Sequence, residues 1–136
     1  MKTAVDSSVL LDVLGADARF GRASREALRA AYDRGALVAC DIVWAEVRAH
    51  FESDAEFHEA VGVLGIRFEP ISSEAAALAG HLWRESRKAA VTPRDRLVAD
   101  FLIGAHAARQ ADALLTRDRG FYRRRFGVTI IDPAEA

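Results

Sequence analysis

The sequence predicts an α/β fold, a three-layer α/β/α sandwich around a central, mostly parallel sheet of four to five strands. Short apolar runs alternate along the chain with longer segments of helical periodicity, which is the pattern of a parallel sheet covered on both faces. Hydrophobic residues make up 51% of the chain and charged residues 29%, as in an ordinary globular protein. Because 136 residues can bury a substantial core, we expect one domain over residues 1–136.

The first half of the chain is expected to form three strands, with two helices between each neighbouring pair. Serines after Asp6 can cap the first helix, and glycines at positions 15 and 35 end the first and second. The third helix carries an apolar stripe that would face the core. In chain order, the expected elements are a strand at 2–5, helices at 7–14 and 19–34, a strand at 36–40, helices at 42–52 and 54–64, and a strand at 66–71.

The second half begins with a long helix over 72–89, which has a serine cap and basic residues in its last turn. Thr92 is suited to cap the next helix and Pro93 to its first position, and this helix reaches about Gln110. The remaining elements are expected as a strand at 111–116, a short helix or helical turn at 117–126 and a strand at 128–131.

Composition argues against several classes of protein. No apolar run approaches the roughly 18 residues of a membrane span, and the first residues lack the form of a secretory signal. We therefore expect a cytoplasmic protein with no membrane partner. Cys40 is the single cysteine, so no disulfide framework is expected, and we interpret it as a small buried residue. The four histidines form no HxxxH pair and are expected to be packing or surface residues.

Three acidic residues are expected at the carboxyl ends of strands. Asp6 directly follows the first strand, Asp118 follows the fourth by two residues, and Glu46 lies about one turn into the helix after the second. Parallel strands end at one edge of the sheet, where ligands bind in such folds, so these side chains are expected on the same rim. Each also has an ordinary explanation: a helix cap for Asp6, a turn residue for Asp118 and a solvated helix residue for Glu46.

Asp100 lies in the middle of the helix expected over 95–110, on its apolar face. Its neighbours along this face are Leu97, Ile103, Gly104 and Ala107. An ionised carboxylate there costs several kcal/mol unless a cation or hydrogen-bond donors compensate for its burial. The ordinary explanation is a buried ion pair with an arginine such as Arg96 or Arg117. A cluster of four carboxylates would instead suit the hard cations Mg²⁺ and Mn²⁺.

Four short motifs resemble the PIN-domain ribonucleases, and within them the VapC-type toxins of bacterial toxin–antitoxin pairs. They are VDSSVLLDVL at the start, VWAEV around Glu46, ADFLIGAHA around Asp100 and LLTRDRGF at Asp118. Their order and spacing cover essentially the whole chain. The family has an acidic residue at each of the four positions Asp6, Glu46, Asp100 and Asp118, and a small polar residue supporting the site at Ser7 and Thr116.

The resemblance implies a metal-dependent endoribonuclease that a small antitoxin holds inactive. We assign Asp6 and Asp100 as principal ligands of Mg²⁺, with Mn²⁺ as a substitute. Asp118 would hold the metal directly or through water, and Glu46 would complete the shell or orient the attacking water. One metal ion and two remain alternatives.

Basic residues are concentrated in one part of the chain, although the net charge is only −1. Residues 84–125 carry 11 Lys or Arg against 5 Asp or Glu, whereas residues 1–83 carry 8 against 13. A basic face of this kind suits RNA phosphates. The candidate RNA-binding residues are Arg94, Arg96, Arg117 and Arg119, with Arg123, Arg124 and Arg125 extending the patch. An ordinary solvated face is the alternative for residues 123–125.

Protein partners follow from the resemblance as well. A cognate antitoxin is expected to bind as a helix in a hydrophobic groove, which Trp44, Phe51, Phe57 and the helix at 7–14 could supply. Core packing is the alternative for Trp44. A homodimer is implied by the family alone.

Other functions fit the residues less well. A phosphotransferase of the haloacid-dehalogenase kind would have an aspartate where Ser8 stands. A receiver domain needs a lysine near the end of the last strand, and the only lysines are Lys2 and Lys88. A dinucleotide-binding domain needs a glycine fingerprint after the first strand, and the chain has none there. A catalytically inactive PIN-like module that binds RNA or protein stays open.

Overall fold

A five-stranded parallel sheet with the order β3-β2-β1-β4-β5 lies at the centre of the computed structural model, which describes residues 1–88 and 98–135. Every neighbouring pair of strands in this order is parallel. The strands are β1 (Thr3–Val5), β2 (Leu37–Cys40), β3 (Ile66–Glu69), β4 (Ala113–Leu115) and β5 (Thr129–Ile131). The predicted parallel sheet is thereby confirmed, at the upper end of the expected number of strands.

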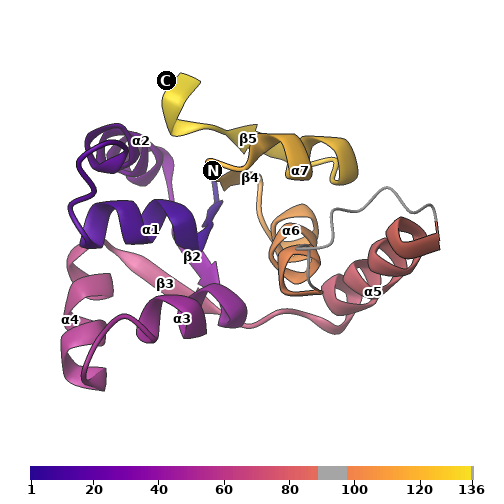
Figure 1. Ribbon diagram of the computed structural model, residues 1–136, viewed down its shortest axis with the longest axis horizontal. Helices are drawn as coiled ribbons and strands as arrows, with labels where there is room; N and C mark the ends of the chain where they lie inside the picture. The colour runs from indigo at the N-terminus through magenta and orange to yellow at the C-terminus, as the bar shows by residue number, and fades with distance from the viewer. Residues whose placement is uncertain (89–97, 136) are drawn as a thin grey trace.

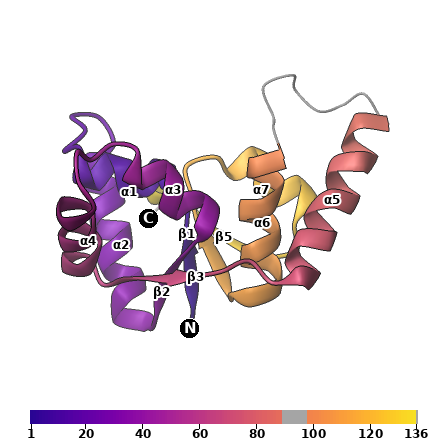
Figure 2. The same ribbon diagram turned by 90° about the horizontal axis from the view of Figure 1, so that it is seen from below.

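Helices cover both faces of this sheet, which makes the three-layer sandwich that the sequence predicts (Figures 1 and 2). One layer holds α1 (Ser7–Leu14), α2 (Gly21–Arg34), α3 (Asp41–Arg48) and α4 (Asp54–Val63). The other holds α5 (Ser73–Lys88), α6 (Val98–Gln110) and α7 (Arg119–Arg125). A 3₁₀ helix, η1 (Pro133–Glu135), follows β5 and packs against α2.

The winding of the chain reverses between β1 and β4. The connections that leave β1 and β2 run over the first helical layer, and those that leave β3 and β4 run over the second (Figure 2). A crevice therefore opens at the carboxyl ends of β1 and β4, the position where open parallel sheets bind ligands. Backbone pairing continues past the strand ends there, because the Asp6 N–H donates to Leu115 O at 3.0 Å and the Thr116 N–H to Ile131 O at 3.0 Å.

Two predicted helices are shorter than expected because side chains stabilise the turns beside them. Asp17 accepts the backbone N–H groups of Arg19 and Phe20 at 2.9 and 2.8 Å, so α2 begins at Gly21 and not at residue 19. Hydrogen bonds of this local kind compete with the helical pattern.

The helix expected over 42–52 ends at Arg48. The Arg48 guanidinium donates to Phe51 O at 2.8 Å and to Asp54 at 2.6 Å, which stabilises the turn after the helix. Ser53 then caps α4 by accepting the Glu56 N–H at 3.2 Å. The predicted cap at Thr92 and Pro93 lies outside the described residues.

Cys40, which is expected to be buried, and His106, one of the histidines expected to be packing or surface residues, both lie in the interior. Cys40 is 1% exposed, and burial raises the pKa of its thiol to about 11, so the thiol is protonated at neutral pH. His106 is also 1% exposed, and its Nε2 lies 2.9 Å from Glu69 Oε1. Within the described ranges, no helix is both long enough and apolar enough to cross a membrane.

Candidate functional site

One cavity of about 450 Å³ opens at the carboxyl ends of β1 and β4, and four acidic residues line it. They are the four that the sequence singles out: Asp6, Glu46, Asp100 and Asp118. Ser7, Ser8, Ile103 and Arg117 complete its wall. The rim predicted from strand ends is therefore present, with acids from the β1–α1 junction, α3, α6 and the β4–α7 connection.

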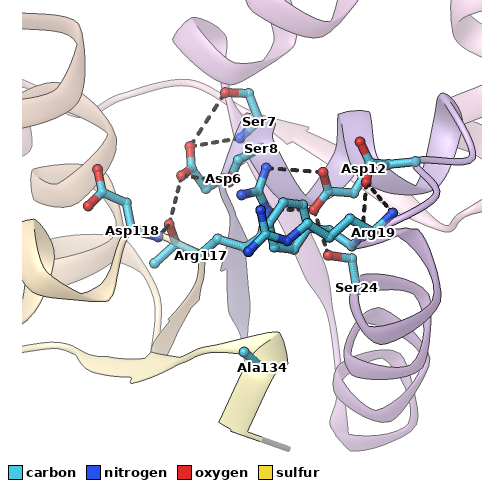
Figure 3. Close-up of polar contacts among 12 residues, drawn as sticks. Asp6, Ser7, Ser8, Asp12, Arg19, Ser24, Arg117, Asp118 and Ala134 are labelled. Carbon is cyan, nitrogen blue, oxygen red and sulfur yellow. Dashed lines mark hydrogen bonds and ion pairs between the residues drawn. The ribbon is translucent and has the colours of Figure 1, made fainter.

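Hydrogen bonds hold both carboxylate oxygens of Asp6 in place (Figure 3). Its Oδ1 accepts the Ser7 N–H at 2.8 Å, so it caps α1 as well as lining the cavity. Its Oδ2 accepts the Thr116 hydroxyl at 2.7 Å and the Ser8 hydroxyl at 3.2 Å. These bonds hold the carboxylate where β1 ends, although Asp6 is only 7% exposed.

Ser7 and Thr116, the predicted supporting residues, each connect two acids. The Ser7 hydroxyl donates to Glu46 Oε1 at 3.0 Å and lies 3.5 Å from Asp6 Oδ1. Thr116 donates to Asp6 and accepts the backbone N–H of Asp118 at 3.0 Å. Elements far apart in the sequence are thereby joined at one edge of the sheet.

Asp100 enters the cavity from the second helical layer. It lies in the first turn of α6, is half-buried, and is followed on the same face by the cavity residue Ile103 and by Gly104 and Ala107, all three buried. The predicted apolar environment of this carboxylate is thus present. Of the two arginines considered as its partner, the structure pairs Arg117 with Asp12, and Arg96 lies outside the described residues.

The electrostatics of the cavity disfavour negative charge. Burial raises the pKa of Asp6, the hydrogen bonds from Thr116, Ser8 and Ser7 offset part of this rise, and the charge of Asp100 adds to it. Burial also raises the pKa of Glu46, with repulsion from Asp6 and Asp100 adding to the effect. Carboxylates with pKa values raised in one cavity indicate a functional site.

The carboxylates of the cavity are suitable ligands for a divalent cation, but they do not form a preassembled metal site. Four carboxylates on one wall supply the hard oxygen ligands that Mg²⁺ and Mn²⁺ prefer. Yet among residues 1–88 and 98–135, no three Asp, Glu, His or Cys side chains lie close enough together to hold a metal ion. Ligation would therefore require side-chain movement toward the ion.

The candidate RNA-binding arginines have varied surroundings. Arg94 and Arg96 lie outside the described residues. Arg117 lines the cavity, but its guanidinium forms an ion pair with Asp12 at 2.7 Å. Arg119 lies 3.2 Å from Glu135 and 3.5 Å from Asp132.

Farther along α7, Arg123 also pairs with Glu135, at 2.8 Å. Arg125 donates to Phe121 O at 3.4 Å. The C-terminal turn therefore neutralises part of the basic patch.

Of the three aromatic residues expected to supply an antitoxin groove, Phe57 is buried, and Trp44 and Phe51 are partly buried. Phe57 is 1% exposed, and Trp44 packs edge-on against it with ring centroids 5.0 Å apart. Phe51 lies 5.9 Å from Phe57 by the same measure. These aromatic rings therefore pack against one another. The packing of Trp44 agrees with the alternative given above, that it packs against the core.

Sequence reasoning missed two residues of this region. Ser8 supports Asp6, and its place two residues after an acidic strand end could have indicated this. Asp12 is a buried acid in α1 that binds Arg117 and Ser24. Its position in an apolar run was the available signal, the same one that identified Asp100.

Fold and site together define an α/β protein with an acidic cavity at the reversal point of a parallel sheet. The model of the PIN domain matches residues 3–127, so the chain belongs to the PIN domain family. No curated protein sequence matches the chain.

Solved structures of low sequence identity share the fold. A chain of VapBC2 from Rickettsia felis, bound to promoter DNA, is similar with a TM-score of 0.74 at 14% identity, over 97% of this chain and 98% of that one. FitAcB from Neisseria gonorrhoeae gives 0.67 at 19%, over 98% and 99%. VapC20 from Mycobacterium tuberculosis, a sarcin–ricin loop cleaving toxin, gives 0.58 at 13%, over 91% and 95%.

Proposed function

We propose that this protein is a metal-dependent endoribonuclease, the toxin of a type II toxin–antitoxin pair. The observation that carries the proposal is the meeting of four carboxylates in one cavity of a PIN domain. Similarity in fold to VapC20, a toxin that cleaves the sarcin–ricin loop, supports RNA as the substrate. Similarity to VapBC2 and FitAcB supports an antitoxin partner.

The cavity residues have distinct roles in this proposal. Asp6 and Asp100 would hold Mg²⁺, with Asp118 and Glu46 completing the site. An ion bound there would supply an acidified water and would withdraw charge from the phosphoryl oxygens. Ser7 and Thr116 orient the carboxylates through the hydrogen bonds described above. Glu46 is exposed at the rim and has a raised pKa, which suits it to accept a proton from the attacking water.

RNA would be held by the basic residues that follow Asp118 along the chain. Arg119 and Arg123 are 50% and 46% exposed, so phosphate can approach them despite their acidic partners. Contacts of this kind position a strand without reading its sequence, and they make binding depend strongly on salt.

A cleavage assay tests the proposal. Purified protein is incubated with RNA in Mg²⁺, in Mn²⁺ and in EDTA, alongside Asp6→Asn and the matched control Asp54→Asn. Asp54 is a solvated acid paired with Arg48 in the layer that holds α4, so it leaves the cavity intact. We expect cleavage by the wild type and the control in either metal, and none in EDTA or by Asp6→Asn. Cleavage that persists in EDTA would contradict the proposal.

We expect an antitoxin helix to bind in a groove between α2 and the end of α4. A cavity of about 650 Å³ lies there, lined by residues that include Leu28, Tyr32, Val63 and Leu64. Val63 is 81% exposed and Tyr32 57%, and both line this cavity, so apolar surface is exposed together there, as at protein interaction sites. We expect Val63→Glu to abolish co-purification with a co-expressed antitoxin while RNA cleavage persists.

A PIN-like module that binds RNA or protein without cutting it is the second candidate. The observation that favours it is the lack of a ready-made metal centre in the described part of the chain. The second candidate would be supported if the protein binds RNA but the assay above detects no cleavage in Mg²⁺ or Mn²⁺.

A further inference from the structure

Arg117 lines the acidic cavity, yet its guanidinium is bound to Asp12 of α1. Asp12 Oδ2 accepts from Arg117 Nε at 2.7 Å, and Oδ1 accepts from Nη2 at 3.1 Å. Figure 3 shows the Arg117 side chain running toward Asp12, while the Asp118 carboxylate points the other way. The connection that ends in Asp118 is thus tied to α1 by a bidentate ion pair.

Further contacts keep this ion pair in place. The side chain of Asp12 is 5% exposed, and its Oδ2 also accepts the Ser24 hydroxyl at 2.8 Å. The Arg117 guanidinium lies 4.0 Å from the centre of the Phe20 ring, a cation–π contact. The backbone of Phe20 is in turn held by Asp17. The guanidinium therefore has a fixed position on the α1–α2 side of the cavity.

We propose that Asp12 is a positioning residue that holds Arg117 away from the four carboxylates and so keeps the cavity open to a divalent cation. An arginine is charged at every relevant pH and forms strong bidentate pairs with carboxylates. Without Asp12, a guanidinium on a flexible stem would lie beside Asp6 and Asp118 and would compete with the metal for them. This role rests on the proposed function, because it requires a cavity that binds such an ion.

Calorimetric titration of the full chain with Mn²⁺ tests the proposal through five proteins. They are the wild type, Asp12→Asn, Arg117→Met, the double variant Asp12→Asn/Arg117→Met, and the control Asp54→Asn, which removes an acid from an Arg48 pair elsewhere. We expect Asp12→Asn to weaken Mn²⁺ binding about tenfold or more, since a hydrogen bond to a charged group is worth about a decade in affinity. Arg117→Met and the double variant should bind Mn²⁺ at least as tightly as the wild type, because a cation beside the carboxylates is removed, and Asp54→Asn should bind it as the wild type does.

The double variant separates this role from a merely structural one. If it binds Mn²⁺ as weakly as Asp12→Asn does, Asp12 does not act through Arg117 and the proposal is overturned. Should Asp12→Asn fail to fold, the pair Arg117→Lys and Arg117→Met serves instead. The lysine keeps a cation but cannot form the bidentate pair, so Arg117→Lys should bind Mn²⁺ more weakly than Arg117→Met, and equal affinities would overturn the proposal.

A crystal structure of Asp12→Asn in EDTA gives a readout that needs neither metal nor RNA. We expect the Arg117 guanidinium to have left the Phe20 ring for Asp6 or Asp118, and a guanidinium still on the ring would overturn the inference. If this movement is seen while the wild type binds no Mn²⁺, the proposed function has failed and the restraint by Asp12 stands. If the wild type binds Mn²⁺ and the guanidinium of Asp12→Asn stays on the Phe20 ring, the restraint by Asp12 is overturned and the proposed function is not.

Discussion

Asp6 and Asp100 each lower the stability of the metal-free fold and at the same time form part of the candidate site. Asp6 needs hydrogen bonds from three side chains or backbone groups to stay at the end of β1, and its pKa is still raised. Asp100 adds to that rise from another layer of the molecule. A charge cluster of this kind opposes folding unless a cation or proton joins it.

Replacing Asp100 by Asn should therefore stabilise the metal-free protein. The neutral amide removes repulsion felt by Asp6 and Glu46, so we expect an increase of up to about 1 kcal/mol in the free energy of unfolding in EDTA. RNA cleavage should be lost in the same variant. Thermal and urea unfolding measure the first effect, and a lower melting temperature than the wild type would speak against repulsion in the cavity.

The raised pKa of Glu46 predicts a pH dependence with a defined sign. The folded state binds this proton more tightly than the unfolded state, so the contribution of Glu46 to stability is greatest below the ordinary carboxyl pKa and is lost as pH rises through the raised value. In EDTA, Glu46→Gln should match the wild type at low pH and exceed its stability at neutral pH. Urea unfolding across this range measures the difference.

Asp54 provides a control of opposite sign. The hydrogen bond and charge of Arg48 lower the pKa of Asp54, so its contribution is present at neutral pH and is lost as pH falls through the lowered value. Asp54→Asn should therefore be less stable than the wild type at neutral pH and approach it in acid. Parallel pH profiles for the two variants would contradict both assignments.

At the scale of elements, α6 is the helix on which the site depends most. It carries Asp100 at its start and packs on β1, β4 and α5. Gly104 allows this approach, since a Cβ there would lie 2.3 Å from Phe126 Cε2. The sequence places Gly104 on the apolar face of this helix, but its neighbour, a phenylalanine 22 positions later in the chain, follows only from the fold.

Gly104→Ala should destabilise the protein by about 1–3 kcal/mol, as expected for overpacking a buried contact. Gly80→Ala is the matched control, because this glycine of α5 has no atom within 4 Å of a Cβ built on it. There the substitution should be neutral or raise stability by up to about 1 kcal/mol through helix propensity. Equal effects of the two substitutions, measured by urea unfolding, would contradict the packing described for α6.

At the scale of the whole molecule, the reversal of winding between β1 and β4 decides where function resides. It separates the helical layers at one edge of the sheet and lets the β1–α1 junction, α3, α6 and the β4–α7 connection each bring an acid to the same cavity. The excess of arginine in residues 84–125 is offset in space by Asp132 and Glu135 of the last turn. Net charge counted along the chain therefore overstates the basic face.

Metal should stabilise the whole fold if the cavity binds it. At a metal concentration a hundredfold above the dissociation constant of the wild type, mass action predicts a gain of about 2.7 kcal/mol in the free energy of unfolding of the wild type. The same concentration is used for every variant. Asp100→Asn should gain less, because it retains fewer ligands. Melting temperatures recorded with and without the ions give the comparison, and an equal gain in both proteins would remove Asp100 from the metal site.

Local patterns along the chain were sufficient to predict the parallel sheet, most of the helix boundaries and the four acids of the rim. Helical and strand periodicity, caps and strand ends depend on neighbouring residues, so they can be read from one segment at a time. The places where prediction failed also have a local cause, as in the turns held by Asp17 and Arg48.

The tertiary structure alone decided which partners these residues have. Asp12 and Arg117 are 105 positions apart, and Thr116 lies 110 positions from Asp6, so no spacing in the chain foretells either hydrogen bond. The same holds for the carboxylates that pair with Arg119 and for the burial of Phe57. Such contacts arise from the order of the strands and the packing of the layers, which bring together segments that the sequence keeps apart.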